Sequence, residues 1–195
     1  MMNPKIEATI DEIFTLYEKY GRADYIGEAI SQIEHMSQAA QLAERDGFDD
    51  EVILAAFFHD IGQICVNESQ YHDMGGFGNQ EHEKVGGEFL RRRGFSEKVA
   101  SLAENHVDAK RYLTYKYPEY YNKLTEASKE TLRYQGGPMS KEEAEAFEQS
   151  PYFKESVKLR EYDEAGKEIG IPLVDMGHMK HLVRKHLTEQ LKHAL

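Results

Sequence analysis

The chain has 195 residues and a formal net charge of −11. A composition of 40% hydrophobic and 30% charged residues is typical of a soluble globular protein, and we expect one domain that spans residues 1–195. The acidic charge argues against nucleic acid as a partner, and the single cysteine, Cys65, excludes an internal disulfide. No apolar run is long enough to span a bilayer and no signal-peptide pattern is present, so we expect no membrane contact and a cytoplasmic protein.

Helical periodicity dominates the first half of the chain. Apolar residues within 6–17 recur every three or four positions, which predicts an amphipathic helix. A second helix is expected from about 29 to 45, and it ends near Gly47. A third, from 51 to about 61, is apolar almost all round and is therefore predicted to be central, with Asp49 or Asp50 as its cap.

The second half is punctuated by loop and capping signals. The glycine-rich stretch 67–78 predicts a loop, and helices are expected at about 80–92 and after Ser96. Ser140-Lys-Glu-Glu143 is typical of a capping box, and Ser150-Pro151 predicts a helix cap followed by proline at the first helical position. A final helix is expected from about Asp175, so the predicted fold is an all-α bundle.

The dipeptide His59-Asp60 lies inside an apolar run, Leu54 to Gln63. A carboxylate buried in such surroundings must be paired or bound to a metal ion. Further candidate ligands stand at long spacing along the chain: His35, His82, His106 and Asp163. Four imidazoles and two carboxylates are ligands for a pair of first-row transition metals.

If His59 and Asp60 lie on a buried helix, the two oxygens of Asp60 can each hold one metal. His35 and Asp163 would then complete one site with His59, while His82 and His106 would complete the other. The remaining histidines are expected to be ordinary surface or core residues: His72, His178, His181, His186 and His193.

The order of these residues resembles the HD-domain superfamily, a helical fold named after that dipeptide. Longer stretches resemble, more narrowly, the PhnZ-type oxygenases that cleave carbon–phosphorus bonds. These stretches are Tyr25-Ile-Gly-Glu28, Ser31 to His35, Asn105 to Lys116, Pro118 to Lys123, Ser128 to Met139 and Lys158 to Lys167. The resemblance covers roughly residues 25–167 and implies an HD-domain helical bundle.

The resemblance implies a mixed-valent Fe(II)/Fe(III) centre. One iron would be held by His35, His59, Asp60 and Asp163, and the other by Asp60, His82 and His106. It also implies that three residues grip the phosphonate oxygens: Lys110, Ser128 and Arg160. A rigid guanidinium fork, a point charge and a hydroxyl donor suit an oxyanion.

The resemblance further implies that Tyr25 and Glu28 belong to a mobile segment. This segment can occupy the second iron when substrate is absent and contacts the cationic end of bound substrate. We therefore expect Tyr25, Glu28 and Lys110 to act in catalysis. Two residues depart from the family pattern: Gln63 stands in the substrate site where a histidine can occur, and Ile26 stands where a small residue is expected.

The implied reaction uses O2 to cleave the carbon–phosphorus bond of a 1-hydroxyphosphonate. The expected substrates are 2-amino-1-hydroxyethylphosphonate, giving phosphate and glycine, or its N-methylated relatives, giving phosphate and a betaine. The sequence leaves open which amine is present, and it leaves open the oligomeric state.

Two other functions fit the same ligands. The stronger alternative is an HD-type metal-dependent phosphohydrolase, in which two metals activate water for attack on a phosphate ester. The other is a catalytically inactive HD module that binds an anionic ligand as a sensor, although six intact ligand positions argue against it. The Tyr25–Glu28 segment and the three phosphonate-gripping residues favour the oxygenase. Metal analysis separates the three.

Overall fold

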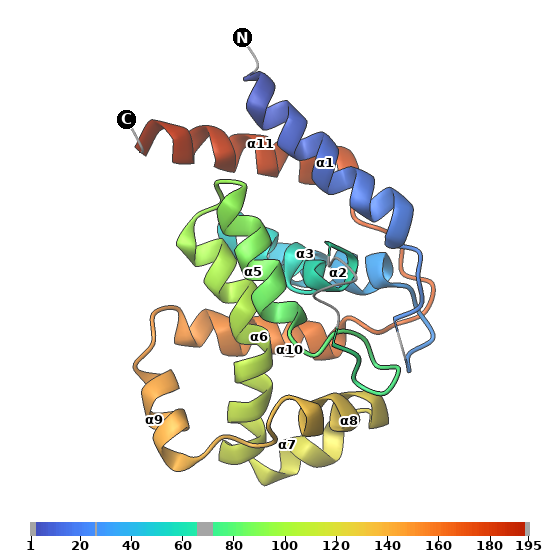
Figure 1. The fold of residues 1–195 in the computed structure, drawn as a ribbon, viewed down its shortest axis with the longest axis vertical. Coiled ribbons are helices and arrows are strands. Elements are labelled where there is room, and N and C mark those ends of the chain that lie inside the picture. Colours follow the sequence, from blue (N-terminus) through green and yellow to red (C-terminus); the bar gives the residue numbers. More distant parts are fainter. Residues whose placement is uncertain (1–2, 26, 66–71, 194–195) are drawn as a thin grey trace.

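The computed structural model describes residues 3–25, 27–65 and 72–193, and these form an all-α bundle with two isolated β-bridges and no strand (Figure 1). The helices, in chain order, are α1 (Pro4–Tyr20), α2 (Gln32–Arg45), α3 (Asp50–Phe58), α4 (Ile61–Cys65), α5 (His82–Arg92), α6 (Glu97–Lys116), α7 (Pro118–Lys123), α8 (Glu126–Tyr134), α9 (Lys141–Glu148), α10 (Phe153–Ala165) and α11 (Met176–His193). In the described ranges, no helix has the length and apolarity needed to cross a bilayer.

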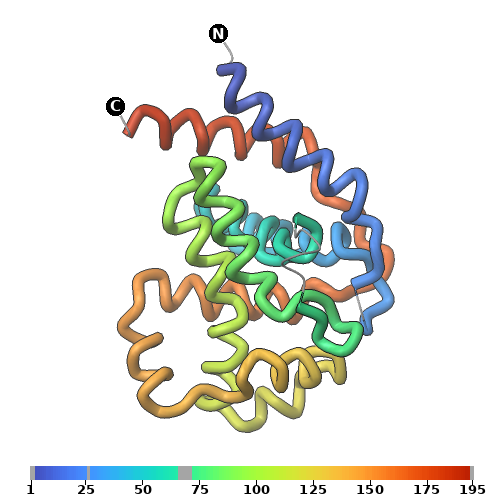
Figure 2. The backbone as a smooth tube through the Cα atoms, in the orientation of Figure 1, coloured from blue at the N-terminus to red at the C-terminus, as the bar shows by residue number. Residues whose placement is uncertain are grey.

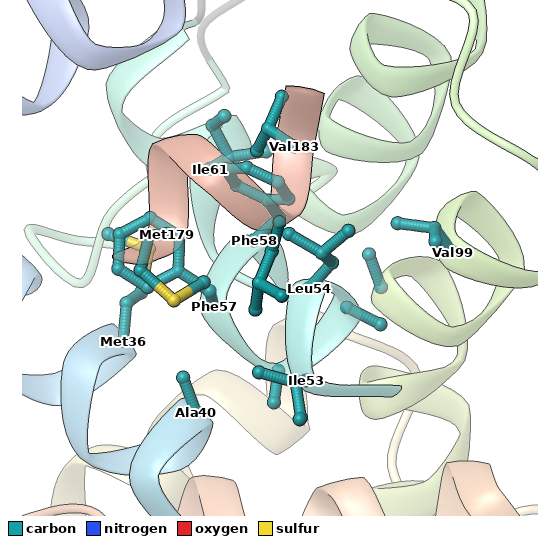
Figure 3. Packing of buried hydrophobic residues seen from close by; sticks show 14 of the residues in the cluster. Met36, Ala40, Ile53, Leu54, Phe57, Phe58, Ile61, Val99, Met179 and Val183 are labelled. Carbon is teal, nitrogen blue, oxygen red and sulfur yellow. The ribbon is translucent and has the colours of Figure 1, made fainter. Parts of the chain in front are cut away.

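The apolar helix α3 lies at the centre of the main core. Seven of its side chains, from Val52 to Phe58, are buried, which confirms the prediction of a central helix. Leu54, Phe57 and Phe58 are fully buried among side chains of α2, α6 and α11 (Figure 3). Burial of such side chains contributes about 1.5–3 kcal/mol each, so this cluster stabilises the part of the bundle that carries the site.

The first and last helices, α1 and α11, pack against each other and cover one end of the bundle (Figures 1 and 2). The buried face of α1 is the predicted one: Ile6, Ile10, Ile13, Phe14 and Tyr17. Helix α11 also contacts α3, and α1 contacts α4. At the opposite end, α6 extends towards α7 and α9 and carries a smaller apolar cluster.

Local capping signals predicted the helix ends well. Asp49 caps α3 by accepting a hydrogen bond from the Val52 amide at 3.0 Å. Helix α6 begins directly after Ser96, as predicted, with Ser96 as its cap. The predicted capping box of Ser140 and Glu143 begins α9. Helix α2 begins at Gln32 rather than near 29, because the capping box of Ser31 sets its first turn.

Two expectations about helices were wrong. His59 is the C-cap of α3 and Asp60 stands in the turn before α4, so the dipeptide lies at a helix interruption, not within one buried helix. Ser150-Pro151 does not begin α10, because the Ser150 hydroxyl donates to the Phe147 carbonyl at 2.6 Å and so closes the preceding helix. Helix α10 begins at Phe153, after Tyr152 with a left-handed φ of 63°.

Parts of two expectations lie outside the described residues: Ile26 and positions 67–71 of the predicted loop. The described remainder of the loop, 72–78, is closed by a bridge between Asp73 and Asn79. Among the histidines expected to be ordinary, His186 is buried, and its Nε2 accepts a hydrogen bond from the Ser96 amide at 3.1 Å.

Candidate active site

Four buried histidines from different helices point their Nε2 atoms at one region between α2, α3, α5 and α6. Each Nδ1 atom lies within hydrogen-bond distance of a backbone carbonyl: Gly166 for His35 at 2.9 Å, Ala56 for His59 at 2.8 Å, Asn79 for His82 at 2.9 Å and Ala103 for His106 at 2.6 Å. A carbonyl oxygen only accepts, so Nδ1 must carry the hydrogen and donate it. In a neutral ring this leaves Nε2 with a free lone pair, as a metal ligand requires.

The Nε2 atoms meet in two pairs. Nε2 of His35 lies 3.0 Å from Nε2 of His59, and Nε2 of His82 lies 3.1 Å from Nε2 of His106. Two lone pairs at that separation repel unless a cation lies between them. Ligand bonds of about 2.1 Å at right angles place neighbouring donor atoms about 3.0 Å apart. The two pairs therefore have the spacing of ligands around metal ions.

Asp60 lies between the two pairs and offers one carboxylate oxygen to each. Its Oδ2 lies 3.6 Å from Nε2 of His35 and 3.5 Å from Nε2 of His59. Its Oδ1 lies 3.1 Å from Nε2 of His82 and 3.5 Å from Nε2 of His106. This is the arrangement of a carboxylate that bridges two metals.

Asp163 completes the first cluster. Its Oδ1 lies 3.3 Å from Nε2 of His35 and is buried without a hydrogen bond from any described residue, while Oδ2 accepts one from Arg160. Burial would raise the pKa of Asp163, but the charge of Arg160 holds it well below the ordinary value. An ionised oxygen is thus left for a cation.

The resulting clusters are His35, His59 and Asp163, and Asp60, His82 and His106. These are the two groups predicted from the sequence. Burial lowers the pKa of His59 to about 4, so the ring is neutral and able to ligate at neutral pH. Nitrogen and carboxylate donors in this mixture suit first-row transition metals. The residues therefore fit a dinuclear metal centre.

The helix interruption at His59-Asp60 depends on a close backbone approach at Gly62. A Cβ atom at this position would lie 1.8 Å from the His82 carbonyl oxygen and 2.7 Å from its carbon. Only glycine allows α4 to approach the start of α5 so closely, and this contact holds His82 opposite Asp60.

A cavity of about 540 Å3 adjoins the two His/Asp clusters. Ten of the residues predicted for the site line it: Tyr25, Glu28, Asp60, Gln63, His82, His106, Lys110, Ser128, Arg160 and Asp163. The remaining two, His35 and His59, are fully buried behind that wall. Figure 1 shows the elements that contribute these residues, from α2 and α3 across α6 to α8 and α10. All the predicted positions are thus brought together, while their roles stay predictions.

Two buried basic side chains, Arg160 and Lys110, line the cavity. Arg160 is held by three partners, donating to the Tyr120 hydroxyl at 2.9 Å and to the carboxylates of Asp163 and Glu164. Nζ of Lys110 donates to the Thr131 hydroxyl at 2.9 Å. Burial, with the Arg160 charge, lowers the pKa of Lys110 to about 7. An anion bound here would meet a fixed guanidinium and a lysine that titrates near neutrality.

The Tyr25 ring stacks on the His35 ring, with centroids 4.0 Å apart and planes 15° from parallel. This contact places Tyr25 against the cluster of His35, His59 and Asp163. Its predicted contact with the second iron stays a prediction.

Gln63 has a structural contact that the sequence did not reveal. Its Oε1 accepts a hydrogen bond from the Asn79 amide at 3.0 Å, which fastens the loop before α5 to α4. Lys167 was not among the residues predicted for the site, and its Nζ lies 3.4 Å from Glu28 and 3.2 Å from Ser128. The available signal was its spacing of three residues from Glu164, and a lone lysine near a helix end is usually a surface residue.

Comparisons with known proteins agree with this geometry. The HD domain model matches residues 32–146. The chain is 42% identical to an uncharacterized protein of Acanthamoeba polyphaga mimivirus, over 95% of this chain and 84% of that protein. It is 35% identical to a [1-hydroxy-2-(trimethylamino)ethyl]phosphonate dioxygenase (glycine-betaine-forming) of Leisingera caerulea, over 93% of this chain and 92% of that protein. It is 34% identical to a hydroxymethylphosphonate dioxygenase of Gimesia maris, over 86% of this chain and 82% of that protein.

Proposed function

The chain belongs to the HD-domain family, and from that premise we propose that it is an oxygenase that uses two iron ions and O2 to cleave the carbon–phosphorus bond of a 1-hydroxyphosphonate. The proposed substrates carry a 2-amino or methylated 2-ammonio group, so that the products are phosphate and glycine or a betaine.

The observation that carries this proposal is the shared position of Asp60. It stands between two histidine pairs and also lines the cavity that Lys110 and Arg160 line. His35, His59, Asp60 and Asp163 would hold one iron, and Asp60, His82 and His106 the other. When bound, the iron pair supplies the site for O2 and the electron transfer that the cleavage requires.

The protein's own residues would bind and orient the phosphonate. Arg160 is pre-positioned by Tyr120 and by two carboxylates, so its guanidinium meets an oxyanion without reorganisation. Lys110 adds a second charge from α6, and the hydroxyl of Ser128 adds a hydrogen-bond donor from α8. These contacts fix the phosphorus end of the substrate, so the carbon that bears the hydroxyl faces the clusters.

The proposed overall reaction balances without a further reductant. The C1–H and C1–P bonds break, both atoms of O2 enter the products, and C1 becomes a carboxylate while phosphorus leaves as phosphate. At the other end of the substrate, the Glu28 carboxylate would face the ammonium group. Gln63 would contribute through the loop it holds, with its amide at the cavity wall.

We also propose that residues 1–195 form one HD-type domain. Helices α1 and α11 lie outside the matched residues 32–146, yet α11 packs on α3 and α1 packs on α4. These contacts give the terminal helices a place on the same core.

The experiment is an assay of phosphate release by iron-loaded protein from 2-amino-1-hydroxyethylphosphonate and from its trimethylammonio relative, with O2 and under anaerobiosis. Release that requires O2 and yields the matching carboxylate is the expected result. Anaerobic release from phosphate esters, without activity on either phosphonate, would contradict the proposal and favour a metal-dependent phosphohydrolase.

A further inference from the structure

Lys167 follows the end of α10 and joins three separate elements beside the substrate cavity. Its Nζ donates to Glu164 Oε1 at 3.1 Å and to Ser128 Oγ at 3.2 Å, and it lies 3.4 Å from Oε1 of Glu28. The Lys167 side chain is only 10% exposed. A lysine so enclosed by carboxylates and a hydroxyl has a specific place in the site, unlike a solvated surface cation.

Glu28 depends on Lys167 for its charge balance. Its Oε1 is buried and receives no hydrogen bond from the described residues, and Lys167 is the cation paired with it there. A buried carboxylate needs a positive partner close by. Lys167 therefore supplies a positive charge at the position where an ammonium-bearing substrate would supply its own.

The contact with Ser128 has a second consequence. A hydroxyl that accepts a hydrogen bond from an ammonium keeps its single hydrogen for another acceptor. Ser128 lines the cavity together with Lys110 and Arg160, and in the described part of the chain its hydroxyl donates to no residue. Lys167 thus leaves the Ser128 hydroxyl to donate to an anion in the cavity.

We propose that Lys167 is a specificity-determining residue that acts as an internal ammonium group opposite Glu28. With Lys167 in place, the Glu28 carboxylate is already neutralised, so the cavity accepts 1-hydroxyphosphonates without an ammonium group as well as those with one. Without Lys167, the bare carboxylate faces a doubly negative phosphonate, and only a substrate that carries its own cation offsets the repulsion. This inference rests on the proposed function and deepens it.

The experiment compares kcat/KM for 2-amino-1-hydroxyethylphosphonate with kcat/KM for hydroxymethylphosphonate, which has no amine. Lys167→Met is expected to raise the ratio of the first to the second by about tenfold or more, because the amine-free substrate suffers most. Lys167→Arg is expected to keep the ratio within about threefold of the wild type, because the positive charge is retained.

Lys158→Met is the matched control. Lys158 pairs with Glu161 on α10 at a spacing of three residues, as Lys167 pairs with Glu164, but it is half-exposed, and its other carboxylate partner is Asp46 rather than Glu28. The control should leave the ratio unchanged. A ratio that is also unchanged in Lys167→Met, or that falls, would overturn the inference.

A second pair of variants serves if the uncompensated Glu28 charge prevents Lys167→Met from folding. Glu28→Gln leaves Lys167 paired with Glu164 alone and removes the carboxylate that would face the substrate's amine. It should lower the ratio about tenfold, because the Lys167 ammonium then repels that amine. Adding Lys167→Met to Glu28→Gln removes both charges and should return the ratio to within about threefold of the wild type. Failure of this return would overturn the inference.

Anaerobic calorimetric titration of both phosphonates into the iron-loaded variants separates this inference from the proposed function. Binding without cleavage in the presence of O2 would contradict the proposed function, while the ratio of dissociation constants would still test Lys167. Cleavage with a binding ratio that does not depend on Lys167 would contradict the inference alone. A wild-type protein that binds neither phosphonate would contradict both.

Discussion

Replacing Asp60 with asparagine removes the charge that the two clusters share while keeping the shape of the side chain. One of the two carboxylate oxygens becomes an NH2 group, which donates hydrogen bonds and cannot ligate a metal. Among the described residues, Asp60 is the only carboxylate grouped with His82 and His106, whereas the other cluster keeps Asp163. The variant should therefore lose metal unequally, and the cluster on His82 and His106 should empty first.

The expected magnitude follows from the burial of the site. Asp60 is only 3% exposed, and loss of one partner from such a buried charged pair costs about 3–5 kcal/mol. This corresponds to a rise of roughly 100- to 5,000-fold in the dissociation constant of the affected metal. Anaerobic loading with ferrous iron, removal of excess metal and elemental analysis should give two ions per wild-type chain and about one per Asp60→Asn chain.

Asp108→Asn on the exposed face of α6 is the matched control and should keep both ions, because Asp108 pairs only with Arg111 among the described residues. Two tightly held ions per chain in Asp60→Asn would refute the bridging geometry.

Three further predictions concern the cavity and its frame. Arg160→Met should raise KM by roughly 30- to 1,000-fold, which corresponds to a loss of about 2–4 kcal/mol of phosphonate binding free energy. It should also weaken iron binding, because Asp163 loses its partner. An unchanged KM would remove Arg160 from the phosphonate site. Burial lowers the pKa of Lys110 to about 7, so its charge is lost as the pH rises through that value, and KM for the phosphonate should rise above about pH 7. In Lys110→Arg the charge persists, so a steady-state profile of KM against pH should be flatter. An equal slope of KM against pH in both proteins would contradict the assignment of Lys110 to the phosphonate site. Gly62→Ala should lower the free energy of unfolding, measured in urea, by more than about 3 kcal/mol, because the added Cβ would overlap the His82 carbonyl. A variant as stable as the wild type would exclude the close approach of Gly62 to His82.

Much of the fold could be predicted because its signals are local. The caps at Asp49, Ser96 and Ser140 each satisfy backbone amides within three residues, so their spacing is visible in the sequence. The prediction that Ser150 caps α10 was wrong because a serine hydroxyl has two kinds of local partner. It can accept from the amides that follow it or donate to a carbonyl that precedes it, and Ser150 donates to the Phe147 carbonyl. The sequence does not show which partner is nearer.

The grouping of the metal ligands could be predicted from the cost of burying His59-Asp60 beside other histidines. The helix interruption at this dipeptide could not, because it depends on the contact between Gly62 and α5. Lys167 was missed because its partners Glu28 and Ser128 are far away in the sequence. Only the tertiary fold places Lys167 beside the Glu28 loop and beside Ser128 on α8, and a single sequence carries no record of those distances.

The central claim, oxygen-dependent cleavage of a carbon–phosphorus bond, is tested most directly by simultaneous measurement of O2 consumption, phosphate release and carboxylate formation. Iron-loaded protein with 2-amino-1-hydroxyethylphosphonate and no added reductant should consume one O2 for each phosphate and each glycine formed. Phosphate release without O2 consumption, or a requirement for an external reductant in every turnover, would contradict the proposed reaction.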